Sequence, residues 1–270
     1  MVRVDPNTGA QSVYATIPHL AACPNALPPG PCKVGDWSCL PPGPCDSGRC
    51  LPPGPCTPTP GGACLPPGPC APVAVDRGSL PNDLAFDDAG NLYVTDSFQA
   101  TIFRVPPGGG QAEAFYQDPR LDTSTIPGFS VGLNGIRVSP DRSKLVVTQT
   151  FGINSGVLTL PLIDHPPLYT LQMVKSYGNN ELPDGLAYGA SGRLYVTLAG
   201  TNQIGLIDPL GREFFRASSS LLDNPANVAF DGRGALLITN HALFGNPADG
   251  GVLNMQVFDV ASPLARPIIP

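Results

Sequence analysis

The sequence predicts an all-β fold, and two observations support this. A unit of two short apolar runs around a glycine-containing turn occurs four times, with copies roughly 45 to 50 residues apart. Pro and Gly are abundant, at 34 and 31 residues, while charged residues make up only 13% of the chain. No stretch approaches the roughly 20 apolar residues of a membrane-spanning helix. Repeats of this length with several short strands are typical of a β-propeller.

Each repeat predicts a four-stranded blade. The first runs of the four copies read PNDLAF from Pro81, LNGIRV from Leu133, PDGLAY from Pro183 and PANVAF from Pro225. A turn and a second run follow, and two β-rich runs around such a turn make a hairpin. A third run ends in Val-Pro-Pro or Ile-Asp-Pro, and a fourth run completes the blade. Strands are therefore expected near 83–117, 134–176, 184–217 and 227–260.

The N-terminus predicts a partial blade. Residues 1–9, MVRVDPNTG, resemble the later part of a repeat, such as 102–109. The chain is therefore expected to start partway through a blade at 1–19, giving about four and a half blades and a gap in the ring. The basic and then apolar segment of a signal peptide does not occur in this chain.

A cysteine- and proline-rich segment interrupts the repeats. All eight Cys lie between Cys23 and Cys70, and the unit LPPGPC occurs four times. Pro excludes helix and central strands, so residues 20–76 are expected to form an irregular insertion. Residues 77–270 would then form propeller blades in one domain with 1–19. The cysteines favour disulfides, or a low-complexity expansion that is merely tolerated, and the absence of Cys-x-x-Cys argues against zinc. A disulfide-rich segment predicts that the full-length protein is secreted or periplasmic.

The charge pattern limits the classes of partner that the protein is expected to bind. The formal net charge is −6, and no basic stripe occurs, so the features of a nucleic-acid-binding protein are missing. Neither a nucleic acid nor a membrane is expected as a partner, and the sequence leaves the oligomeric state open.

Polar side chains recur where each first strand begins. Asn82, Asn134 and Asp184 share one offset, and in a propeller this end of the innermost strand lies at the central channel. Asn227 falls one residue later, where the first repeat has Asp83. These residues are expected to converge on one end of the channel and to offer oxygen ligands to a hard cation such as Ca²⁺.

The alternative is structural, because Asn and Asp are also ordinary turn residues before a strand. The ends of the second strands should lie on the same face, which adds Asp96, Gln149, Asn240 and His241. Asp96 and Asn240 would then cap turns, and His241 is expected to be structural or solvated.

These motifs resemble the senescence-marker-protein/gluconolactonase family, which includes regucalcin. The resemblance implies a six-bladed propeller with a divalent metal in the channel, held here by Asn134 and Asp184. It implies that Asn82 and Asp83 border the substrate, with general-base work for Asp83, and that Asn227 joins this shell. The family's Glu ligand comes from a first blade that has no counterpart in this chain, so weak cation binding is expected.

The leading functional prediction is a metal-dependent lactone or ester hydrolase with a small-molecule substrate. The cation, Ca²⁺ or alternatively Zn²⁺, Mn²⁺ or Mg²⁺, would polarise the carbonyl, and Asp83 would activate water. No Gly-x-Ser-x-Gly elbow or phosphate-binding loop competes with this interpretation. The alternatives are a non-catalytic propeller of NHL type that serves as a binding module, and an inactive truncated fragment.

Overall fold

The computed structural model describes residues 1–22, 70–168, 170–178, 180–232, 235–242 and 250–256, together with the backbone of 57–58 and 64–65. Regular structure in this part is almost entirely β, with one short 3₁₀ turn at Pro119–Leu121. No helix in these residues is long and apolar enough to cross a membrane.

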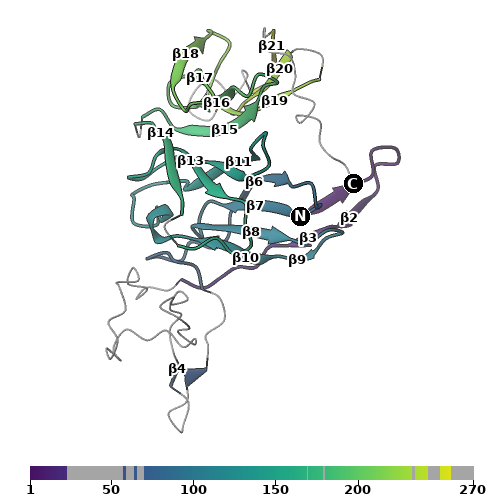
Figure 1. The fold of residues 1–270 in the computed structure, drawn as a ribbon, viewed down its shortest axis with the longest axis vertical. Coiled ribbons are helices and arrows are strands. Elements are labelled where there is room, and N and C mark those ends of the chain that lie inside the picture. Colours follow the sequence, from purple (N-terminus) through teal and green to yellow (C-terminus); the bar gives the residue numbers. More distant parts are fainter. Residues whose placement is uncertain are drawn as a thin grey trace.

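Four antiparallel sheets form successive propeller blades (Figure 1). Blade 1 contains β6 (Pro81–Phe86), β7 (Leu92–Asp96), β8 (Thr101–Val105) and β10 (Glu113–Gln117). Blade 2 contains β11 (Leu133–Val138), β12 (Lys144–Gln149), β13 (Gly156–Pro161) and β14 (Gln172–Ser176). Blade 3 contains β15 (Pro183–Tyr188), β16 (Leu194–Leu198), β17 (Gln203–Ile207) and β18 (Glu213–Ser218). Blade 4 shows β19 (Pro225–Phe230), β20 (Ala235–Asn240) and β21 (Gly251–Gln256). The predicted all-β propeller is confirmed.

The first strands of the blades are the innermost ones. The strand β6 packs beside β11, β11 beside β15, and β15 beside β19. In Figure 1 the sheets fan outwards from these four strands. The residues predicted to form the site therefore come from neighbouring strands although they are far apart in sequence.

The N-terminal residues do not form a larger blade among the described residues. The strands β1 (Val2–Val4) and β2 (Gln11–Val13) pair only with each other. The next strand, β3 (Ala15–Thr16), runs parallel to β9 (Gly110–Gln111), just before β10 of blade 1. The predicted partial blade is thus a separate hairpin followed by a strand that is attached to blade 1.

The two ends of the cysteine-rich segment are anchored on blade 1. Ala22 and Ala71 form a parallel bridge, and Leu20, Ala71 and Val73 are buried in the core that includes blade 1. Between them the structure describes only the backbone of β4 (Thr57–Pro58) and β5 (Cys64–Leu65). Cys70 takes part in a disulfide. The side chains of the other seven cysteines lie outside the described residues, so the wider set of disulfides stays a prediction.

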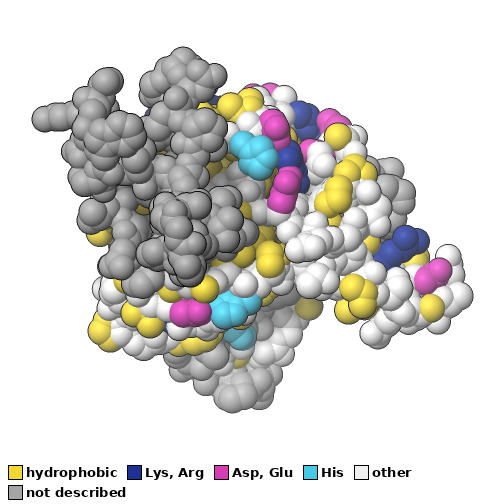
Figure 2. All heavy atoms as spheres, turned by 90° about the horizontal axis from the view of Figure 1, so that it is seen from below, with side chains coloured by type: hydrophobic (Ala, Val, Ile, Leu, Met, Phe, Trp, Pro, Cys, Tyr) yellow, Lys and Arg dark blue, Asp and Glu magenta, His cyan; other side chains and the backbone are white. Residues whose placement is uncertain are grey.

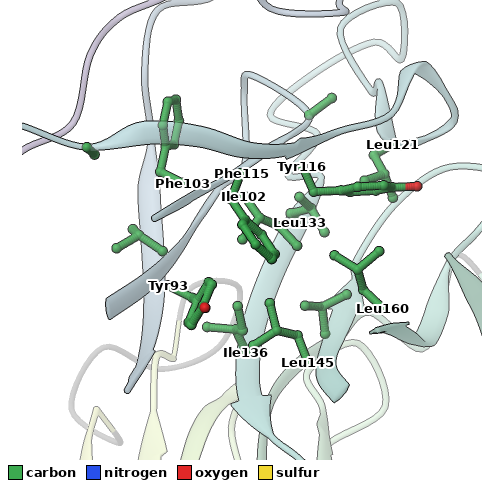
Figure 3. Close-up of a cluster of buried hydrophobic side chains, with 14 of the residues drawn as sticks. Tyr93, Ile102, Phe103, Phe115, Tyr116, Leu121, Leu133, Ile136, Leu145 and Leu160 are labelled. Atoms are coloured by element: carbon green, nitrogen blue, oxygen red, sulfur yellow. The ribbon is translucent and has the colours of Figure 1, made fainter. Parts of the chain in front are cut away.

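The hydrophobic core lies between blades. The largest cluster joins blades 1 and 2, where aromatic residues of blade 1 meet aliphatic residues of blade 2 (Figure 3). Tyr93 packs edge-to-face on Phe115, with ring centroids 4.9 Å apart. Ile136 and Leu145 face this cluster from β11 and β12, and neither is exposed to solvent. Similar clusters join blades 2 and 3 and blades 3 and 4, so burial between sheets holds the inner strands in place.

Glycine allows two neighbouring inner strands to approach closely. A Cβ on Gly185 would lie 2.5 Å from Cα of Asn227, and one on Gly135 would lie 2.6 Å from the carbonyl oxygen of Asp184. Neither distance is compatible with a side chain unless the backbone shifts. These glycines therefore serve inter-blade packing and not a turn.

Gly185→Ala is expected to lower the free energy of unfolding by about 1–3 kcal/mol, because the added methyl group overpacks the contact between β15 and β19. Gly178→Ala is the matched control, since its Cβ would meet only a carboxylate oxygen at 3.7 Å. Urea denaturation of both variants measures the difference. Equal losses of stability would contradict the packing argument.

Candidate functional site

Local irregularity places the predicted residues at one end of the inner strands. The start of each inner strand pairs with the end of the second strand, as in Pro81 with Asp96 and Leu133 with Gln149. The register then shifts by a bulge in all four inner strands. Bulges re-aim side chains and are common next to active sites. Asn82, Asn134 and Asp184 all lie within these bulges, which confirms their common offset.

Asn82 and Asn134 are oriented in the same way. The side-chain amide of Asn82 donates to the hydroxyl of Ser97, and that of Asn134 donates to the hydroxyl of Thr150, each at 3.0 Å. Asn134 is only 4% exposed, whereas Asn82 is exposed. The buried Asn134 is therefore held in the interior and Asn82 lies nearer to solvent.

Asp184 is the most perturbed acid of this region. Its side chain is hydrogen-bonded to Asn134, and Asp83 is near enough to repel it. Burial, with that repulsion added, raises the pKa of Asp184 to about 8, and no basic side chain among the described residues offsets the rise. A carboxylate in this setting gains stability from a cation.

Asp83, for which the sequence predicts a general-base role, is held by three hydrogen bonds. Its Oδ2 accepts from a guanidinium nitrogen of Arg137 at 2.6 Å and from the backbone N–H of Ile136 at 3.1 Å. Its Oδ1 accepts from the N–H of Leu84 at 2.8 Å. A carboxylate offers about four lone-pair sites, so one site on Oδ1 is left for a further donor such as water.

Asn227 occupies in blade 4 the position that Asp83 occupies in blade 1. The backbone N–H of each residue donates to the hydroxyl of the second-to-last residue of the adjacent second strand, Thr95 for Asp83 and Thr239 for Asn227. The Oδ1 of each also accepts from the next backbone N–H in the chain. The predicted one-residue offset of Asn227 is confirmed.

Arg137 connects these residues across the inner strands. It lies on β11, donates to Asp83 of blade 1, and places its other terminal nitrogen 3.3 Å from Oδ1 of Asn227 on blade 4. The sequence interpretation did not single it out. The repeats contain a signal, because Arg137 stands where blades 1 and 3 have Ala85 and Ala187. We call the group formed by Asp83, Asn134, Arg137, Asp184 and Asn227 the inner-strand cluster.

A row of threonines fixes the spacing of the inner strands. The hydroxyl of Thr95 donates to the carbonyl of Asn134 at 2.5 Å, and that of Thr197 donates to the carbonyl of Ala226 at 3.0 Å. Thr148 donates in the same way to the carbonyl of Asp184. Each threonine thus ties one blade to the next beside a site residue. Their recurrence in the repeats was the available sequence signal.

The residues that end the second strands serve the structure. Asp96 is fully buried and accepts from the Ser79 hydroxyl and from the backbone and side-chain nitrogens of Gln99. Asn240 is also buried, and its amide donates to the carbonyl of Leu221. His241 is exposed. These positions agree with the capping and solvated roles expected from the sequence.

The donor set of the inner-strand cluster fits a hard cation. No group of three or more His, Cys, Asp or Glu side chains among the described residues is placed to hold a metal. A cation here would instead depend on the amide oxygen of Asn134 and the carboxylate of Asp184, two side chains that are joined in this structure by a hydrogen bond from the Asn134 amide N–H to the carboxylate. Amide and carboxylate oxygens are the ligands of Ca²⁺ and Mg²⁺, with water completing the shell.

Charges elsewhere form small local groups. Arg104, for example, pairs with Glu113 and Asp164 at the blade edge. On the face shown in Figure 2, acidic, basic and histidine side chains are interspersed without a broad patch of one sign.

Comparison with known proteins places the chain in a family. Residues 70–242 match the SMP-30/gluconolactonase/LRE-like region, and the chain therefore belongs to this family. A search of curated proteins found no significant match.

Solved structures with the same fold include enzymes and a binding protein. A regucalcin described as calcium-binding, from Agrobacterium tumefaciens, is 18% identical with a TM-score of 0.50, covering 67% of this chain and 64% of that one. A putative gluconolactonase is 17% identical with a TM-score of 0.50, covering 67% and 60%. A gluconolactonase from Xanthomonas campestris is 21% identical with a TM-score of 0.47, covering 59% and 54%. This chain thus spans less than two thirds of each of these proteins, and the likeness to the two structures with a TM-score of 0.50 supports the propeller fold.

Proposed function

We propose that this propeller is a metal-dependent hydrolase of lactones or esters, of the gluconolactonase type. Membership of the SMP-30/gluconolactonase family supports the reaction class. The observation that carries the proposal is the contact between Asn134 and Asp184, with Asp83 near enough to raise the pKa of Asp184. The neighbouring inner strands β11 and β15 thereby present the amide of Asn134 and the carboxylate of Asp184, and β6 presents the carboxylate of Asp83.

The residues divide the chemistry between them. Asn134 and Asp184 would hold the cation, which supplies a Lewis acid for the carbonyl oxygen of the substrate. Asp83 would take a proton from the attacking water through the lone pair that its three present donors leave free. Asn82, which is exposed and fixed by Ser97, and Asn227 would border the substrate. Ca²⁺ is the proposed ion, with Mg²⁺, Mn²⁺ and Zn²⁺ as alternatives for the test.

The test is hydrolysis of a panel of γ- and δ-lactones and aryl esters, with and without a chelator and with each cation restored. Cation-dependent hydrolysis of at least one class is the expected result. Cation binding without hydrolysis of any class would favour the binding-module alternative. Hydrolysis that survives complete chelation would contradict the assignment of the cation.

A further inference from the structure

Arg137 is a charged residue at a position that holds alanine in the other three blades, buried in blades 1 and 3 and exposed in blade 4. Ala85 and Ala187, the equivalent residues of blades 1 and 3, are 8% and 5% exposed. Arg137 instead turns its guanidinium toward the site and spans from blade 1 to blade 4. Its side chain is only 25% exposed, and that of its partner Asp83 is 12% exposed. An ion pair of this kind is shielded from solvent more than a surface pair.

The cluster therefore holds two carboxylates and one fixed cation. Arg137 neutralises Asp83, whereas Asp184 is influenced, within the described part of the chain, by the uncharged Asn134 and by the repulsion of Asp83. A divalent ion at Asp184 would draw on both carboxylates and would be repelled by the guanidinium. Interactions between charges several ångströms apart are appreciable even where water screens them, and they are stronger for a divalent ion than for a monovalent one.

We propose that Arg137 is a tethered cation that sets the affinity of the channel for a divalent ion. Its positive charge offsets the negative charge of Asp83 and also repels the ion. The site therefore binds the ion weakly and exchanges it readily. The inference rests on the proposed cation site at Asn134 and Asp184 and does not require that the protein hydrolyses lactones. Arg137 also positions Asp83, since it fixes the Oδ2 side of that carboxylate.

Calorimetric titration with CaCl₂ or MnCl₂ alone tests the proposal without any substrate. Arg137→Gln is expected to bind the ion at least roughly tenfold more tightly than the unmodified protein. Arg137→Lys keeps the charge and should stay within about threefold of the unmodified protein. Arg142→Gln is the matched control. Arg142 lies just after the same strand with a side chain 26% exposed, but it pairs with Asp88, away from the cluster, so its removal should leave the affinity unchanged.

A double variant makes the test independent of how well Arg137→Gln folds. Asp83→Asn alone leaves the guanidinium without a carboxylate partner and should weaken cation binding roughly tenfold or more. The double variant Asp83→Asn with Arg137→Gln removes one charge of each sign and leaves two amide side chains that can pair with each other. The affinity of this variant for the cation should therefore return toward that of the unmodified protein. Circular dichroism confirms folding in each case.

Three results would overturn the proposal. The first is that folded Arg137→Gln binds the ion no more tightly than the unmodified protein, and the second is that the double variant binds no better than Asp83→Asn. The third is that neither the unmodified protein nor Arg137→Gln binds Ca²⁺ or Mn²⁺ at all. A protein that binds cations in the predicted order but hydrolyses no lactone would retain this proposal and lose the proposed activity.

Discussion

Asp184→Asn is expected to weaken cation binding at least about a hundredfold and to abolish cation-dependent hydrolysis. Loss of residues that only support a metal ligand typically costs 10- to 100-fold in affinity, so loss of a charged ligand should cost no less. The change is nearly isosteric, and Asn can keep the hydrogen bond to Asn134. It therefore separates loss of the ligand from loss of the fold. Calorimetry with Ca²⁺ and the lactone assay are the two measurements.

Two control variants make this result specific. Asp88→Asn removes the same charge from a side chain that is 59% exposed on a turn of blade 1. His241→Ala removes the exposed imidazole that directly follows β20, the second strand of blade 4. Both proteins should bind the cation as the unmodified protein does. Tight Ca²⁺ binding that survives loss of both Asn134 and Asp184 would place the ion elsewhere and remove the main physical support for the hydrolase.

The repeats made the inner-strand positions predictable because a local rule generates them. Every blade pairs the start of its first strand with the end of its second, so an equal sequence offset becomes an equal place in space. The same comparison predicted that Asn227 is equivalent to Asp83 and not to Asn134. The position of each site residue along its strand could thus be predicted from the sequence.

Side-chain contacts between blades could not be predicted from the sequence in the same way. The sequence interpretation gave Asp83 the role of a general base but no side-chain partner, and the structure pairs it with Arg137 from the next blade. That contact depends on side-chain reach across two strands and on the bulge in each, which no repeat pattern specifies. The substitution of Arg for Ala in one repeat was visible, but its partner was not.

The packing of the two ends of the cysteine-rich segment also could not be predicted from the sequence. Composition predicted an irregular insertion from 20 to 76, because a segment rich in Pro and Gly forms no core of its own. The structure buries Leu20, Ala71 and Val73 against blade 1. Three apolar residues at the edges of such a segment carry no periodic signal, so their burial follows only from the bridge between Ala22 and Ala71.

The second large effect is a dependence of stability on pH that Asp184 imposes. Its pKa in the folded chain is raised to about 8, whereas an unfolded Asp titrates near 3.9. Between these values the folded chain binds more protons than the unfolded chain, so stability falls as pH rises from about 4 to about 8. The loss should be on the order of 2–4 kcal/mol, allowing for solvent that reaches this side chain.

Asp184→Asn should remove this loss, because the amide does not ionise. The variant is therefore expected to be more stable than the unmodified protein at pH 8 and to differ little from it at pH 4. Ca²⁺ should stabilise the unmodified protein at pH 8 but not the variant, because binding favours the ionised carboxylate and releases its proton. Urea denaturation at both pH values, with and without Ca²⁺, measures all of these differences. A variant that is less stable than the unmodified protein at pH 8 would show that the ionised Asp184 stabilises the fold. It would contradict the expectation that this carboxylate lowers stability when no cation is bound.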